Sequence, residues 1–185
     1  LSPASAFSGG LKKILKELEE MFEDGQLTSS SLVKISNVHF FRTPVNCVFS
    51  SSDPERKFIK KLVAENSAKL IDSWLKSRDV GFYSIEYAWR KGEHWKIAKF
   101  NPDVFIKINK DIIVLELKMD DDVTDENKAK LKYAREHFDK LNELQKKNRY
   151  YFKFISPSDY DLFFESLKDK TYSKFKSSLE ADLDD

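Results

Sequence analysis

The sequence predicts an α/β protein in which helices flank a mixed β-sheet. Three observations support this fold class. Apolar residues make up 41% of the chain and include fifteen phenylalanines, which is the composition of a globular protein with a core. Helical and β-prone segments follow one another in the order helix, strands, helix, strand, helix. Only five glycines and five prolines interrupt the 185 residues, which favours long regular elements in one domain of ordinary size.

Residues 1–50 are predicted to form an N-terminal helix and a connecting region. Apolar residues recur at helical spacing between residues 11 and 22, and Gly25 is suited to end that helix. Residues 27–54 mix short β-prone runs with serine-rich breaks, which indicates one or two short strands. This region carries no motif that points to a chemistry.

A second helix is predicted to open at residue 53. Asp53 is a suitable N-cap, Pro54 suits the first helical position, and Glu55 is favoured in the first turn. An apolar stripe predicts that this helix continues as far as Trp74. The stripe consists of Phe58, Leu62, Leu70, Ile71 and Trp74.

The rest of the chain alternates strands and helices. Strands are predicted at GFYSIEYAW, within HWKIAKFNPDVFIKI, at DIIVLELK and at RYYFKFIS. A short helix is expected at SDYDLFFESLKD and a long one near residues 125–147. The stripe of the long helix consists of Leu131, Ala134, Phe138, Leu141 and Leu144. We expect a core at residues 51–170 and an acidic, frayed tail at residues 171–185.

Residues 101–118 predict a β-hairpin with charged residues at its open end. If Asn109 and Lys110 form a two-residue loop, Asp103 lies directly opposite Glu116, with Cβ atoms about 4.5–5.5 Å apart. Lys118 follows Glu116 by two positions and shares that face of the hairpin. The other face is wholly apolar and consists of Val104, Ile106, Ile108, Ile113, Leu115 and Leu117. A slip of one residue would separate the two acids, so the clean apolar face favours this register.

The three charges at the hairpin end predict a particular chemistry. Two carboxylates so close repel each other unless a positive charge lies between them. A pair of hard oxygen ligands suits Mg²⁺, which can polarise a phosphoryl oxygen and activate a bound water, and an adjacent lysine can stabilise charge on the phosphate. Asp103, Glu116 and Lys118 therefore predict a site for an anionic phosphodiester. The alternative is a structural salt bridge in which Lys118 satisfies both acids.

The same residues resemble a known nuclease family. The dipeptide PD at residues 102–103 is followed at hairpin distance by ELK at residues 116–118, which resembles the PD-(D/E)XK signature. The helix that begins DPERKFIKKL resembles the first helix of these nucleases and places Glu55 where an acid often joins the site. Residues 126–142 resemble the segment after the active site in type III restriction enzymes and their helicase-nuclease relatives. The resemblance extends from residue 53 to about residue 168.

The resemblance implies a restriction-endonuclease-like fold and a Mg²⁺-dependent DNA endonuclease, with Mn²⁺ as a substitute metal. Asp103 and Glu116 would be metal ligands and Lys118 the catalytic lysine. Glu55 would be a further ligand, unless it is only an acid favoured at a helix start. The alternative to an enzyme is an inactive module of the same fold that binds DNA or docks a subunit.

The resemblance also implies partners. In these relatives the nuclease follows a helicase motor that uses ATP, and a separate methyltransferase subunit carries the recognition specificity. We therefore expect a helicase region elsewhere in a longer chain, which agrees with a first residue, Leu1, that is not methionine. The sequence contains no Gly-Lys-Ser/Thr phosphate loop, so this piece is not the motor.

A basic segment predicts where DNA would lie. Residues 128–149 contain eight basic and three acidic side chains, in a chain with a net charge of +1. Lys128, Lys132 and Arg135 are expected to face away from the helix stripe, and Lys130 to reach the hairpin end. Such a patch would contact phosphates and make binding salt-dependent. The alternative is a solvated helix face with ordinary ion pairs.

Three aromatic side chains and one cysteine complete the prediction. Tyr87, Trp89 and Trp95 flank the first strands and are interpreted as core or rim, with stacking on an unpaired base as the open alternative. Cys47 is the single cysteine, which excludes an internal disulfide and fits a reducing compartment. No apolar run approaches the roughly 18 residues that span a bilayer, so we expect a cytoplasmic location and no membrane partner.

Overall fold

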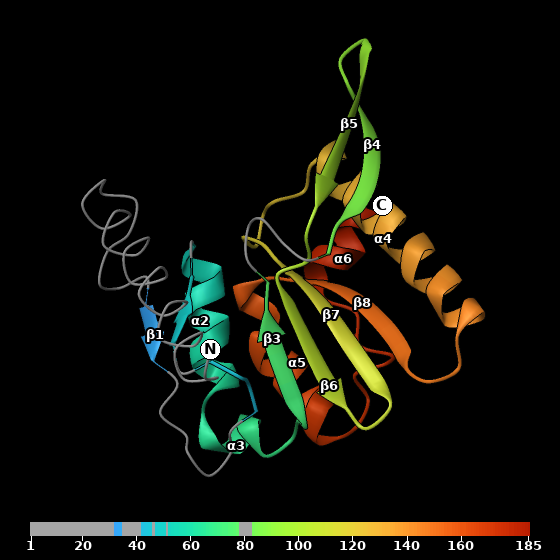
Figure 1. The fold of residues 1–185 in the computed structure, drawn as a ribbon. Coiled ribbons are helices and arrows are strands. Elements are labelled where there is room, and N and C mark those ends of the chain that lie inside the picture. Colours follow the sequence, from blue (N-terminus) through green and yellow to red (C-terminus); the bar gives the residue numbers. More distant parts are fainter. Residues whose placement is uncertain (1–31, 35–41, 46, 51, 78–82) are drawn as a thin grey trace, which may run out of the picture.

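A four-stranded sheet in the order β3-β6-β7-β8 forms the centre of the computed structural model, which describes residues 32–34, 42–45, 47–50, 52–77 and 83–185 (Figure 1). The strands are β3 (Ser73–Lys76), β6 (Val104–Ile108), β7 (Asp111–Leu117) and β8 (Arg149–Ile155). β6 pairs antiparallel with both β3 and β7, whereas β8 runs parallel to β7. The predicted mixed sheet with flanking helices is therefore confirmed.

The long helix α4 (Asp125–Leu144) makes the crossover that the parallel pair β7–β8 requires. It begins after Thr124, whose hydroxyl accepts a hydrogen bond of 3.1 Å from the backbone N–H of Asn127. Leu131, Ala134 and Phe138 of the predicted stripe are buried. The last stripe residue, Leu144, is 76% exposed, because the helix ends at this residue and not near residue 147.

The predicted register of the β6–β7 hairpin is confirmed. Val104 pairs with Leu115 and Ile108 with Asp111, which leaves Asn109 and Lys110 as the loop. Asn109 adopts the left-handed conformation with φ of 54°, which asparagine tolerates better than most residues. All six residues of the predicted apolar face are buried. The pairing therefore places the next residues outward, an aspartate and a glutamate, opposite each other at the open end.

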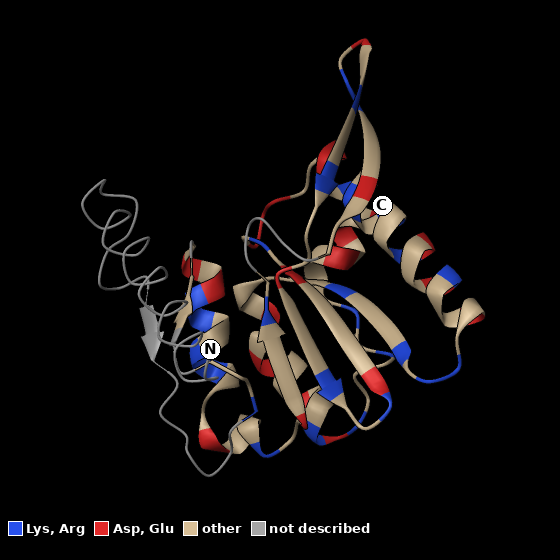
Figure 2. Ribbon diagram, in the orientation of Figure 1, with Lys and Arg blue, Asp and Glu red and all other residues tan. Residues whose placement is uncertain are grey.

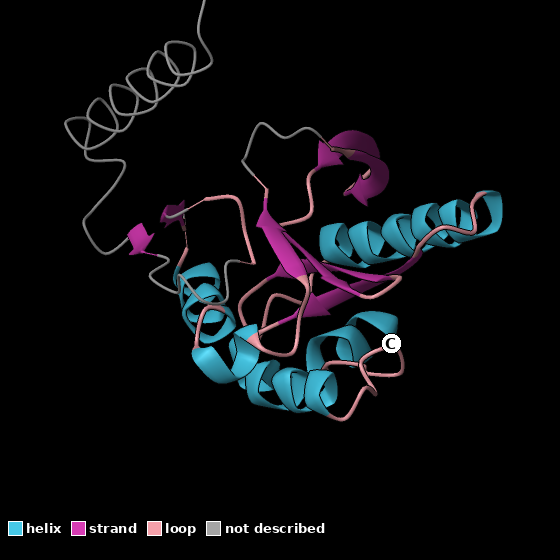
Figure 3. Cartoon of the chain, turned by 60° about the horizontal axis from the view of Figure 1, so that its bottom comes forward, coloured by secondary structure: helices cyan, strands magenta, loops and turns pink. Residues whose placement is uncertain are grey.

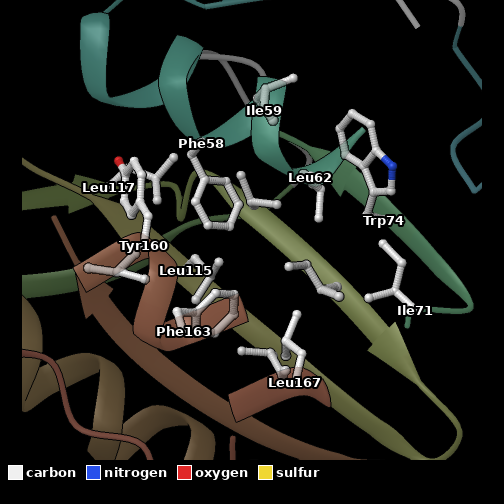
Figure 4. Packing of buried hydrophobic residues seen from close by; sticks show 14 of the residues in the cluster. Phe58, Ile59, Leu62, Ile71, Trp74, Leu115, Leu117, Tyr160, Phe163 and Leu167 are labelled. Carbon is white, nitrogen blue, oxygen red and sulfur yellow. The ribbon is translucent and has the colours of Figure 1, made fainter. Parts of the chain in front are cut away.

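Helices cover both faces of the sheet (Figure 3). The apolar face of the hairpin packs against α2 (Asp53–Leu62) and α5 (Tyr160–Lys168). Figure 4 shows these side chains meeting above the strands. The centre of the Phe58 ring lies 5.2 Å from the centre of the Tyr160 ring and 5.9 Å from that of Phe163. The other face packs against α4 and the C-terminal helix α6 (Ser178–Asp184). This double cover explains why the central strands are almost continuously apolar.

The predicted second helix is wrong in its extent. α2 ends at Leu62, and a short α3 (Glu65–Ala68) and strand β3 take the place of its second half. Trp74 is buried as expected, but as a strand residue paired with Ile106. Its spacing from the preceding apolar residues suits a helix as well as a strand, and pairing with β6 decides for the strand. The N-cap is also one residue earlier than predicted, because the Ser52 hydroxyl accepts the Glu55 amide.

The acidic C-terminal segment is ordered, and the expectation of a frayed tail is wrong. α6 inserts Leu179 and Leu183 into the core between α4 and β8, and both side chains are less than 5% exposed. Glu180 is buried and accepts a hydrogen bond of 3.1 Å from the Phe154 amide of β8. The acids that suggested a solvated tail therefore alternate with apolar residues that anchor the helix.

One or two short strands were predicted in the connecting region, and two are present, β1 (Leu32–Lys34) and β2 (Cys47–Phe49), which pair antiparallel. The helix predicted at residues 11–22 lies outside the described residues. A second hairpin, β4 (Ile85–Lys91) and β5 (His94–Phe100), forms its own two-stranded sheet, and a turn of 3₁₀-helix (Pro157–Asp159) precedes α5. Within the described part of the chain, no helix has the length and apolar character needed to cross a membrane.

Candidate active site

Asp103 lies at the open end of the β6–β7 hairpin, where backbone hydrogen bonds hold it on both sides. Its Oδ2 accepts a hydrogen bond of 2.7 Å from the backbone N–H of Leu117. Its own carbonyl accepts one of 2.7 Å from the Ser77 N–H, next to β3. Because the register places Glu116 opposite, these bonds hold the Asp103 carboxylate beside a second acid.

Glu116 is buried in the sheet, with 4% of its surface exposed. Its Oε1 lies 2.9 Å from the Lys118 ammonium. Its Oε2 is buried and has no hydrogen-bond partner among the described residues. A buried carboxylate oxygen without a donor is costly, so a cation bound at this oxygen would stabilise it.

The electrostatics of the pair show mutual repulsion in a poorly solvated place. Burial, followed by the charges of Glu116 and Glu55, raises the pKa of Asp103 to about 8. Burial also raises the pKa of Glu116, although Lys118 and Lys130 oppose the shift. Burial alone would lower the pKa of Lys118, but Glu116 outweighs it and raises that pKa. Burial and the repulsion between the acids therefore both disfavour a pair in which each carboxylate is charged.

Glu55 reaches this cluster from the first turn of α2, as the resemblance implies. The side chain is buried, and its Oε2 lies 3.2 Å from the Nζ of Lys76 on β3. Lys76 also lowers the pKa of Asp103, so one lysine serves two acids. Sequence reasoning missed Lys76, because it predicted a helix as far as Trp74 and no strand at residues 73–76. The signal available was a lysine at the end of a strand-compatible run, SWLK.

Tyr160 at the start of α5 is a second neighbour that the sequence did not reveal. Its hydroxyl donates a hydrogen bond of 3.0 Å to the Pro54 carbonyl at the beginning of α2. Burial raises its pKa, and Asp103 adds to the shift, so the phenol stays neutral beside the acids. The residue ties α5 to the helix turn that carries Glu55.

Lys130 is the predicted basic residue that the structure brings to the site. Its ammonium opposes the raised pKa of Glu116, and it lies 3.4 Å from Glu126 and 5.4 Å from the centre of the Tyr87 ring. The Tyr87 hydroxyl donates a hydrogen bond of 2.5 Å to the same Glu126. These contacts fix the first turns of α4 against β4.

The other predicted DNA-binding residues lie elsewhere on α4. Lys132 is exposed and Lys128 is half-buried on the same helix. Arg135 is directed to the C-terminal helix, where it lies 2.5 Å from Asp184 and 3.7 Å from the buried Glu180. Arg135 thus has a structural role between α4 and α6.

A groove of about 510 Å³ opens beside Lys118, between the β4 end of the second hairpin and the start of α4. Its lining includes Trp89, Lys91, Lys118, Asp122, Glu126 and Lys130. Lys118 therefore stands between the buried acids on one side and a space open to solvent on the other, with 21% of its side chain exposed.

The residues present fit a small, hard divalent cation. Among the described residues, no three His, Cys, Asp or Glu side chains are grouped to hold a metal ion. Mg²⁺, however, is commonly held by one or two carboxylates and keeps several waters. Asp103 and Glu116 supply that pair, and the Glu116 Oε2 is a ligand atom without a donor. Glu55 already pairs with Lys76, so it is the less available of the three predicted ligands.

Comparisons with known proteins add no assignment for this chain. No protein-family model, no curated protein and no solved structure matches it.

Proposed function

We propose that this chain is a Mg²⁺-dependent DNA endonuclease domain with a restriction-endonuclease-like core. One observation carries the proposal. The buried Asp103–Glu116 pair has raised pKa values, holds an oxygen with no donor, and lies next to Lys118 at a solvent-open groove. A structural salt bridge in which Lys118 satisfied both acids would not leave the Glu116 Oε2 atom without a donor.

The roles of the residues follow from their positions. Asp103, oriented by the Leu117 amide, and Glu116 would hold the cation. When bound, Mg²⁺ would supply a Lewis acid for a phosphoryl oxygen and lower the pKa of a bound water. Lys118 keeps its charge, because its pKa is raised, and would stabilise the developing charge on the phosphate from the groove side. Lys76 and Lys130 limit the repulsion between the acids before the cation arrives.

The proposed context is that of the resembling enzymes. The substrate would be DNA, and Mn²⁺ would substitute for Mg²⁺. The domain would act with a helicase region of a longer chain and with a methyltransferase subunit that sets specificity, as in type III restriction enzymes. The mixed sheet with helices on both faces is compatible with the fold that this resemblance implies.

One contact favours a second candidate, an inactive module of the same fold. Lys118 already lies 2.9 Å from Glu116, which is the geometry of a finished ion pair. In that case the domain would bind DNA or dock a subunit, and the acids would have no metal to hold.

Supercoiled plasmid nicking by the 185-residue protein distinguishes the two candidates. The reaction is run with Mg²⁺, Mn²⁺ or EDTA, beside Lys118→Ala and Lys110→Ala. Lys110 is an exposed lysine at the opposite end of the same hairpin and serves as the matched control. We expect metal-dependent nicking that Lys118→Ala abolishes and Lys110→Ala retains. Absence of nicking, together with no metal-induced thermal shift, would exclude the enzyme and leave the module.

A further inference from the structure

The β4–β5 hairpin extends from the core as an arm (Figure 1). Its base is fixed, because Ile85, Tyr87 and Phe100 are buried in the core against α4. Its outer part, residues 88–97, pairs only within the hairpin and is mostly exposed. We call these ten residues the arm tip. A well-anchored ribbon with a free end is a shape suited to reach a partner.

The side chains of the arm tip are aromatic, apolar and basic. Trp95 is 72% exposed and Ile97 is 79% exposed. Arg90 lies across the hairpin from Trp95, so a cation and an indole share one face. The tip has three lysines or arginines and a single acid, Glu93 (Figure 2).

Strand β4 of the arm tip borders the candidate active site. Trp89, Arg90 and Lys91 of this strand all line the groove that also contains Lys118. Gly92 at the turn lines the same groove and has φ of 62°, which allows the tight reversal between the strands. A ligand held by the arm tip would therefore run along the groove toward Lys118.

We propose that the arm tip grips duplex DNA and directs one strand through the groove to Lys118. This inference rests on the proposed function, since it names the element that holds the substrate of that site. The major groove of B-DNA admits a two-stranded β-ribbon, and tryptophan and arginine are suited to contact bases and phosphates. The arm tip combines Trp95 with Arg90, Lys91 and Lys96 and carries a single acid, so its charge is complementary to the DNA backbone. DNA is therefore a better occupant than a second copy of a chain whose net charge is +1.

Binding is measured by fluorescence anisotropy with a labelled 30-base-pair duplex and the matching single strand, in EDTA. The variants are Lys91→Ala/Lys96→Ala and Trp95→Ala. The control is Lys168→Ala/Lys174→Ala, two exposed lysines distant in sequence from the arm. We expect each arm variant to weaken duplex binding about tenfold and the control to change it less than twofold. The double lysine variant should also reduce the slope of log affinity against log salt by about two.

Three outcomes would overturn the proposal. The first is that the arm variants bind the duplex as tightly as the control does. The second is that they lose affinity only for the single strand. The third is that the wild-type protein sediments as a dimer and Trp95→Ala dissociates it, which would assign the surface to a second copy. The binding measurement does not depend on nicking, so the two proposals fail separately. If the arm variants weaken binding but the protein does not cleave DNA, only the proposed enzyme is contradicted. If the protein cleaves DNA and the arm variants cleave it equally well, only the role of the arm tip is contradicted.

Discussion

Lys76 Nζ lies 3.2 Å from Glu55 Oε2, and the two side chains are only 9% and 8% exposed. This pair joins the start of α2 to the end of β3, directly beside Asp103. It therefore connects the stability of the sheet edge to the electrostatics of the candidate site.

Lys76→Ala is predicted to lower the free energy of unfolding by about 3–5 kcal/mol, because it removes the buried cation that forms an ion pair with the Glu55 carboxylate. Urea denaturation measures the change. The matched control is Lys69→Ala, which removes an exposed partner of Glu65 and should leave the urea midpoint unchanged. If Lys76→Ala behaves like the control, Glu55 is solvated in solution and the buried pair is not a determinant of stability.

Glu116→Gln is predicted to raise the melting temperature in EDTA by about 2–4 °C, which corresponds to about 1 kcal/mol for a domain of this size. Above about pH 8, where Asp103 loses its proton, the amide removes the repulsion with Asp103 and preserves the shape of the side chain. The same variant should lose the thermal shift that Mg²⁺ or Mn²⁺ gives to the wild-type protein. Glu143→Gln, at an exposed site near the end of α4, should change neither quantity. Destabilisation in EDTA would instead favour the structural ion pair with Lys118.

Stability in EDTA is predicted to rise as the pH falls from about 8.5 toward 5. The folded-state pKa of Asp103 is raised to about 8 from an ordinary value of 3.8, so between these values the folded protein holds a proton that the unfolded chain releases. Protonation thus favours the folded state by on the order of 1–3 kcal/mol over this range. Asp103→Asn should make the free energy of unfolding less dependent on pH over this range. A wild-type curve that is already flat would show that Asp103 is charged throughout.

Leu179→Ala is predicted to cost about 2–5 kcal/mol, because the side chain is completely buried between α4 and β8. Asp182→Ala changes an exposed residue of the same helix and should leave the urea midpoint in place. The comparison measures whether α6 belongs to the folding unit. If the two variants have equal urea midpoints, the acidic segment is frayed in solution, as its composition suggested.

Local rules were sufficient for the hairpin and insufficient for the region before it. Only one register of residues 104–117 gives the hairpin a wholly apolar face, so the positions of Asp103 and Glu116 followed from counting. Between Leu70 and Lys76 the apolar spacing suits both a helix and a strand. Hydrogen bonds to β6 made it a strand, and those bonds depend on a partner 30 residues away.

The sequence by itself therefore determined the mixed α/β class, the hairpin register and the three charges at its open end, because these depend on spacing within short segments. The tertiary structure decided what surrounds them. It paired Lys76 with Glu55, brought Lys130 to the acids, buried α6 and placed the arm tip beside Lys118. Burial and long-range pairing set those contacts and the raised pKa values, and neither is encoded in the spacing of neighbouring residues.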